Sequence, residues 1–189
     1  KLANTYFDAG RIYLEERPEQ AESMWRRATE LDIEHISSRE ALAALYIKQR
    51  NAAKAIEQYE ALAQVMPTNP AYFRQLGLFY VGMRDFSKAE QALQTLIKLN
   101  PQDPMGYRTL VQVYLNTDQK SDLALKLATR ATQLQPNAES HFILGLALAR
   151  NGKREQAIRT VQKAVELAPE KTSYQRFLKS LQEGRRADD

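Results

Sequence analysis

A period of about 34 residues runs through the 189-residue chain and constrains its fold more than any other feature. Pro67 and Pro101 are 34 positions apart, Pro101 and Pro136 are 35 apart, and Pro136 and Pro169 are 33 apart. Self-similarity at a period of this length is typical of repeat proteins, in which each repeat is one supersecondary unit. We therefore interpret the chain by units before assigning any single element.

Small and apolar residues recur in the register of the prolines. Leu76-Gly77 recurs as Leu42-Ala43, Leu110-Val111 and Leu144-Gly145, and Ala89 recurs as Ala55, Ala124 and Ala157. The spacing around Gly77 predicts a helix, a turn and a second helix. A glycine inside a helix costs about 1 kcal/mol relative to alanine, so we expect Gly77 to lie with Ala89 where two helices cross closely.

These units resemble tetratricopeptide repeats, whose pattern is a large residue, Leu-Gly, an aromatic residue, two alanines flanking a large residue, and a terminal proline. Residues 70–103 match it most fully, through Phe73, Leu76, Gly77, Tyr80, Phe86, Ala89, Leu96 and Pro101. The resemblance implies an all-α fold, a right-handed α-solenoid of stacked antiparallel helix pairs. Because no pair can cover its own apolar face, each unit packs on its neighbours.

The register divides the chain into five repeats and a C-terminal helix within one domain over residues 1–189. We expect repeats at about 2–35, 36–69, 70–103, 104–137 and 138–171, a capping helix at about 172–183, and a disordered tail at 184–189. Ser37-x-x-Glu40 and Ser87-x-x-Glu90 have the pattern of capping boxes at helix starts.

Two units depart from the pattern. The first has Asp8 in place of leucine and Ile33 in place of proline, which predicts a distorted repeat. The fourth has one extra residue between Asn116 and Asp122, which predicts a looser turn. Because Lys1 is not an initiator methionine, we expect N-terminal truncation or processing, with any targeting segment either absent or already removed.

Composition excludes several classes of protein but leaves the compartment unknown. The chain has no cysteine, which excludes disulfides, thiol catalysis and cysteine-bound metal. Its longest apolar run, Phe142 to Ala149, is too short to cross a bilayer, so no membrane insertion is expected. The net charge of +4 divides into −3 through His35 and +7 over the remainder, a polarity that favours an acidic partner or head-to-tail self-association.

No catalytic motif is found, and the sequence indicates a protein that is not an enzyme. The two histidines, His35 and His141, are far apart and are interpreted as packed or solvated residues. Glu15 and Glu16 are adjacent on a helix and do not face each other. We expect no cofactor, no metal and no small-molecule substrate.

The resemblance places the functional surface on the first helix of each repeat, which lines a concave groove in the family. The partner-binding candidates that it implies are Tyr6, Tyr13, Glu40, Ile47, Lys48, Arg74, Leu78, Val81, Met105, Arg108, Gln112, Leu115, Phe142, Leu146 and Arg150. Arg74 and Arg108 occupy the same place in successive repeats and are expected to favour an acidic segment. The lysine and asparagine clamp of chaperone-binding members is absent.

The resulting hypothesis is a non-catalytic scaffold that binds a peptide, helix or loop of another protein in this groove. An accessory arm of a larger multidomain enzyme or assembly is the main alternative, which the full-length gene would decide. A self-associating module is a further alternative. RNA binding, known for helical repeats of similar period, is disfavoured because the groove is largely apolar and the surplus charge is small.

Overall fold

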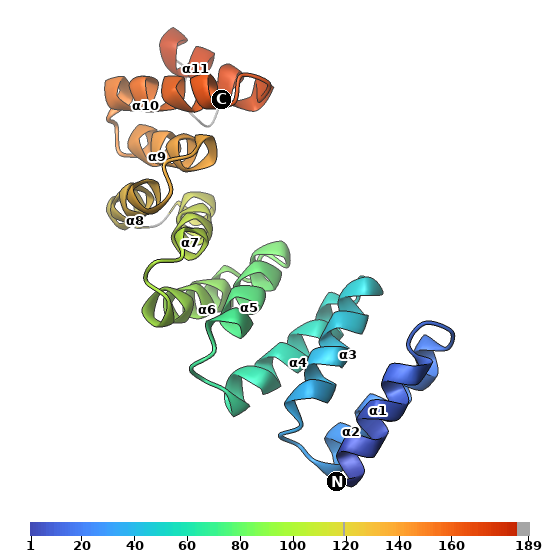
Figure 1. Cartoon of the computed structure of the whole chain (residues 1–189). Helices are drawn as coiled ribbons and strands as arrows, with labels where there is room; N and C mark the ends of the chain where they lie inside the picture. The colour runs from blue at the N-terminus through green and yellow to red at the C-terminus, as the bar shows by residue number, and fades with distance from the viewer. Residues whose placement is uncertain (119, 185–189) are drawn as a thin grey trace. The chain divides into compact units, whose positions relative to one another are not determined.

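The structure is a computed structural model that describes residues 1–118 and 120–184. These residues form eleven α-helices and no β-strand (Figure 1), so the predicted all-α class is confirmed. The helices are α1 (Leu2–Tyr13), α2 (Pro18–Leu31), α3 (Ile36–Lys48), α4 (Ala52–Val65), α5 (Pro70–Gly82), α6 (Phe86–Leu99), α7 (Pro104–Thr117), α8 (Ser121–Leu134), α9 (Ala138–Arg150), α10 (Arg154–Leu167) and α11 (Thr172–Glu183).

Helix boundaries follow the predicted register. The first helix of every predicted unit begins at the first residue of that unit, and α11 spans the residues expected for the capping helix. The helices before Pro67, Pro101, Pro136 and Pro169 each end two residues ahead of the proline. This spacing is expected because proline lacks an amide hydrogen and disfavours helical backbone in the residue before it. Residues 185–189 of the predicted tail lie outside the described residues.

The chain divides within α5 into two compact units, Lys1–Phe79 and Tyr80–Asp189, and each is described by itself. In the first unit α1 packs on α2, and α3 packs on both α2 and α4. In the second unit α9 lies between α8 and α10, and α11 packs on α10 (Figure 1). The expectation of one domain over the whole chain stays a prediction.

Gly145 shows why a glycine stands inside a helix of this fold. A methyl group on Gly145 in α9 would overlap the side chain of Val161 in α10 and lie 3.6 Å from the carbonyl oxygen of Ala157. Ala157 and Val161 are both fully buried. Glycine therefore serves the close crossing of the two helices, and the stability gained by packing outweighs its low helix propensity.

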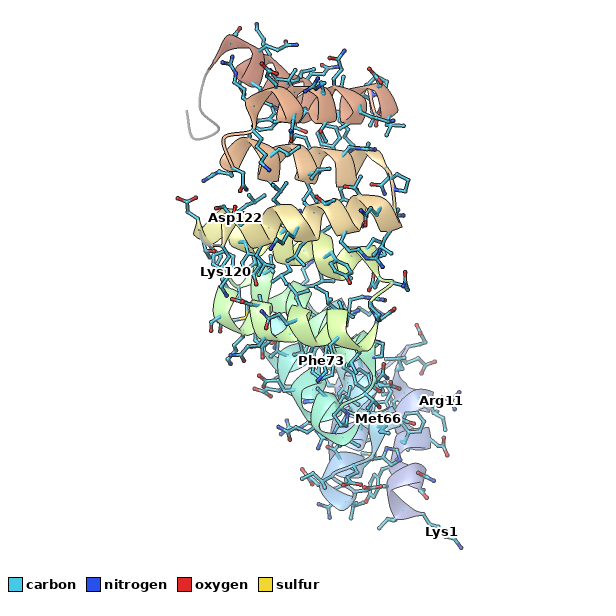
Figure 2. All side chains as sticks on the ribbon, turned by 90° about the vertical axis from the view of Figure 1, so that its left-hand side faces the viewer. Lys1, Arg11, Met66, Phe73, Lys120 and Asp122 are labelled. Carbon is cyan, nitrogen blue, oxygen red and sulfur yellow. The ribbon has the colours of Figure 1, made fainter. Side chains whose placement is uncertain are left out.

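Two similar polar networks join helices within the units. Tyr46 on α3 donates its hydroxyl to Glu22 on α2 at 2.9 Å, and Lys54 on α4 donates to the same carboxylate oxygen at 3.0 Å. In the second unit, two repeat periods further along, Glu90 on α6 accepts from the Tyr114 hydroxyl at 2.8 Å and from Lys120. Figure 2 shows Lys120 beside the start of α8.

The networks shift the ionisation of their members. Partial burial alone would raise the pKa of Glu22, but the hydrogen bonds from Lys54 and Tyr46 outweigh it and hold the pKa below the ordinary value of 4.5. Burial, followed by the hydrogen bond to Glu22, raises the pKa of Tyr46 to about 12. These charge-assisted bonds join the second helix of one repeat to the helix pair of the next repeat.

The predicted capping boxes are wrong. His35 is the N-cap of α3 and accepts a hydrogen bond from the Ser38 amide, while Asp85 is the N-cap of α6 and accepts from the Lys88 amide at 3.1 Å. Ser37 lies in the first turn of α3 instead of preceding it. A side-chain acceptor two residues earlier starts each helix and satisfies an amide of its first turn, so the serine is not needed as a cap.

The turns that join the two helices of one repeat share one left-handed residue. Arg50, Arg84, Asp118 and Gly152 have positive φ angles of 53° to 70° and are spaced at 34 residues. In the fourth unit Lys120 is also left-handed, with φ of 53°, so the extra residue predicted between Asn116 and Asp122 lies after Asp118. Residues 14–17, between α1 and α2, include no left-handed residue.

Candidate functional site

The first unit has a groove of about 400 Å³ between α1 and α3. These are the first helices of the first two repeats, and they run in the same direction (Figure 1). The groove is mainly apolar, and it is lined by Phe7, Arg11, Leu14, Trp25, Ser37, Glu40, Ala41, Ala44, Leu45 and Lys48.

Trp25 from α2 forms part of the groove wall although it is only 2% exposed. Its indole N–H donates to the backbone oxygen of Phe7 at 3.1 Å. A methyl group on Gly10 would overlap the indole ring. The absence of a side chain at Gly10 therefore allows the indole to pack against α1.

Small residues on α3 leave the groove open. Ala44 is exposed in the groove, and the equivalent positions one and three repeats later hold Leu78 and Leu146. Ala41 is also a lining residue, one turn earlier on the same face of α3. A larger side chain at either position would fill space that is now accessible, so the two alanines keep the groove open.

Charged side chains stand at the two ends of the groove. Arg11 lies in the last turn of α1 and Lys48 is the last residue of α3, and both are exposed. The Arg11 side chain extends outward from α1 (Figure 2), is 68% exposed and lies 3.9 Å from a carboxylate oxygen of Asp8, which is equally exposed. At the other end, Glu40 accepts a hydrogen bond from the Tyr72 hydroxyl at 2.8 Å. Burial, followed by this bond, raises the pKa of Tyr72 to about 12.

The structure brings Glu40 and Lys48, two of the predicted site residues, into this groove. Tyr6 instead lines a separate hollow of about 540 Å³ with charged residues of α2. Tyr13 and Ile47 are exposed, at 36% and 43%, but do not line the groove.

Predicted residues on α5 differ in exposure. Leu78 is 43% exposed, whereas Arg74 and Val81 are half-buried. Arg74 lies in the first unit and Arg108 in the second, so their predicted juxtaposition stays a prediction.

Arg108 is held by groups of its own unit. Its side chain is 14% exposed and lies 3.4 Å from a carboxylate oxygen of Glu139. Its guanidinium also donates to the side-chain oxygen of Gln135 at 2.6 Å and to the Ser140 hydroxyl at 3.4 Å. Arg150 pairs with Asp118 at 3.0 Å. Both arginines therefore already bridge neighbouring helices or turns.

The C-terminal helix covers part of the predicted surface. Phe142 stacks on Tyr174 of α11 with ring centroids 4.2 Å apart, and it contacts Phe177 edge-on at 5.7 Å. The other candidates on α7 and α9 vary: Gln112 is exposed, and the half-buried ones are Met105, Leu115 and Leu146.

Sequence reasoning missed most of the groove lining, including Phe7, Leu14, Trp25, Ala41 and Ala44. A signal existed in part, because Ser37, Ala41, Ala44 and Lys48 recur every three or four residues and so share one face of α3. Trp25 gave no such signal, because it reaches the groove from a second helix.

His35 is held by hydrogen bonds, and His141 is half-buried. His35 accepts from the Ser38 amide through Nδ1, so its Nε2 donates to the side-chain oxygen of Asn4 at 2.8 Å. Burial, followed by repulsion from Lys163, lowers the pKa of His141. Among the described residues no cluster of histidine and carboxylate groups could hold a metal ion, and no helix is long and apolar enough to cross a membrane.

Family models identify the repeats directly. Two models described as tetratricopeptide repeat match residues 46–113 and 138–171, which together are more than half of the chain. The chain belongs to the tetratricopeptide-repeat family. No curated protein matches its sequence.

Solved structures of tetratricopeptide-repeat proteins share the fold. YrrB, described as a repeat protein with an unusual peptide-binding site, superimposes with a TM-score of 0.79 and 21% identity over 92% of this chain and 90% of its own. MamA from Desulfovibrio magneticus gives 0.73 and 23% identity over 77% and 82%. TTC0263 from Thermus thermophilus gives 0.60 and 19% over 95% and 98%.

These matches confirm the predicted α-solenoid of stacked helix pairs. Tetratricopeptide repeats bind other proteins and are generally non-catalytic, so the family supports a protein-interaction scaffold with a protein partner.

Proposed function

We propose that this tetratricopeptide-repeat protein binds a segment of a partner protein in the groove between α1 and α3. The observation that carries the proposal is an accessible, mainly apolar groove of about 400 Å³ with charged residues at its ends. Protein-binding sites combine an apolar centre with a polar rim, and buried anchor side chains supply most of the affinity.

An acidic partner segment is part of the proposal. Lys48 and Arg11 place two cations at one end of the groove. Arg11 also lies 3.9 Å from Asp8, but both side chains are 68% exposed, so this pair is weak and screened by solvent. Arg108, which sequence reasoning favoured for this role, is already paired with Glu139. A ligand carboxylate at Arg108 would replace an existing contact, whereas a carboxylate near Lys48 would add one.

Selection from a phage-displayed library of random linear peptides tests the proposal. Ala44→Phe fills the groove without disturbing the core, because Ala44 is exposed. Ala53→Phe on α4 is the matched control, since Ala53 is also exposed and lies outside the groove. The affinity of the selected peptides should fall about tenfold or more with Ala44→Phe and stay unchanged with Ala53→Phe. Equal affinity for both variants would contradict the proposal that this groove binds the partner segment.

A further inference from the structure

We infer that the occupant of the α1–α3 groove is an amphipathic helix of the partner, lying antiparallel to α1 and α3 with a carboxylate in its first turn. The inference rests on the proposed function and specifies the conformation, direction and charge of the segment bound.

The polar groups of the groove favour a helix over an extended chain. Away from the helix ends, the amides and carbonyls of α1 and α3 are occupied within the helices, and the Trp25 N–H is already donated to Phe7. An extended peptide would bury its own amides and carbonyls against an apolar surface with few partners, at a cost of about 1 to 3 kcal/mol for each unsatisfied group. A helix satisfies these groups internally and presents only side chains.

The dimensions of the groove agree with this mode of binding. Its lining on α3 runs from Ser37 to Lys48, which corresponds to about 16 Å at 1.5 Å per residue, or about three helical turns. The exposed Ala44 and the neighbouring Ala41 leave a channel that accepts side chains from a third helix. A ligand helix of three turns places apolar residues at positions i, i+4 and i+7 on one such face.

Charge sets the direction of the ligand helix. Arg11 and Lys48 mark the end where α1 and α3 terminate, while Glu40 lies in the first half of α3. An acidic residue is most stable in the first turn of a helix, where the macrodipole is positive. The N-terminal turn of the ligand therefore belongs beside Arg11 and Lys48. The dipoles of ligand and groove helices then run antiparallel, which is the favourable arrangement.

The experiment compares two phage-displayed libraries of equal size. One randomises the exposed face of a rigid helical scaffold, and the other randomises a linear segment of alternating apolar and polar residues. The affinity of the binders selected from each library is measured for the unaltered chain, for Ala44→Phe and for the double variant Arg11→Glu with Lys48→Glu. The control is Lys98→Glu, which changes an exposed lysine outside the groove. Circular dichroism establishes that every variant keeps its helix content.

We expect the helical library to yield binders that carry an acidic residue in the first turn. Their affinity should fall about tenfold or more with Ala44→Phe and with the double variant, and should be unchanged by Lys98→Glu. Groove-dependent winners from the linear library alone would overturn the helical inference and leave the proposed function standing. Winners that are insensitive to Ala44→Phe would overturn both. Helical winners with the acid in the last turn, or no winners from the helical library, would also overturn the inference.

Discussion

Arg154 at the start of α10 donates through Nε to the carbonyl oxygen of Leu181, near the end of α11, at 2.7 Å. A second donor of the same guanidinium bonds the carbonyl of Gln182 at 3.0 Å. The last carbonyls of a helix have no partner within the helix and carry partial negative charge. One arginine therefore both satisfies the end of the C-terminal helix and holds it against α10.

Arg154→Ala should release this end of α11. The loss of two charge-assisted hydrogen bonds at a partly exposed site is expected to cost about 1 to 2 kcal/mol of unfolding free energy. Amide hydrogen exchange within α11 should accelerate more than in α9. Arg159→Ala, at an exposed position five residues later on α10, is the control and should change stability by less than about 0.5 kcal/mol. Similar exchange rates in the two variants would contradict the anchoring role.

Gly145→Ala should destabilise the second unit, although alanine is the better helix former. The added methyl group meets Val161 in a fully buried crossing, so overpacking is expected to cost about 1 to 3 kcal/mol. Chemical denaturation followed by circular dichroism measures the change. Gly145→Ala combined with Val161→Ala should recover part of the loss, because the smaller residue makes room for the methyl group. If the second substitution recovers none of the lost stability, overlap with Val161 is not the cause of the loss.

Two buried serines at equivalent positions predict opposite responses to alanine. The hydroxyl of Ser38 has no hydrogen-bond partner among the described residues, whereas that of Ser140 accepts from Arg108 at 3.4 Å. Ser38→Ala removes an unsatisfied polar group and should be neutral or stabilising by up to about 1 kcal/mol. Ser140→Ala should instead lower the free energy of unfolding by about 1 kcal/mol, as measured by thermal unfolding. A larger loss for Ser38→Ala would contradict the assignment.

Acidification should weaken the networks at Glu22 and Glu90. Both carboxyl groups have pKa values below the ordinary 4.5, with burial opposing and hydrogen bonds from lysine and tyrosine causing the decrease. A lowered folded-state pKa gives stability that is present above the unfolded-state value and is lost as pH falls through the folded-state value. Unfolding free energy should therefore decline as pH falls below about 4.5.

The double variant Glu22→Gln with Glu90→Gln isolates this contribution. It should be less stable than the unaltered chain at neutral pH, because the charge-assisted bonds become neutral ones. The difference between the two proteins should shrink as pH falls. A constant difference down to strongly acidic pH would show that the two carboxylates do not contribute to the pH dependence.

Much of the fold was predictable because its signals are local. The prolines end helices through missing amides and steric exclusion in adjacent residues, and the 34-residue register located the start of every first helix. The N-caps were mispredicted, since serine, aspartate and histidine can each accept from an amide in the first turn of a helix. Which acceptor binds depends on backbone geometry at the cap, and the capping-box pattern does not distinguish His35 from Ser37.

By itself the sequence determined an array of helix pairs and the faces on which apolar residues gather, because both follow from periodicity along one chain segment. Only the tertiary structure decided which part of that surface is accessible. Trp25 reaches the groove from α2 beside Gly10, Glu139 engages Arg108, and α11 covers Phe142. Each outcome depends on contacts between residues about 15 or more positions apart, and such contacts are set by helix packing.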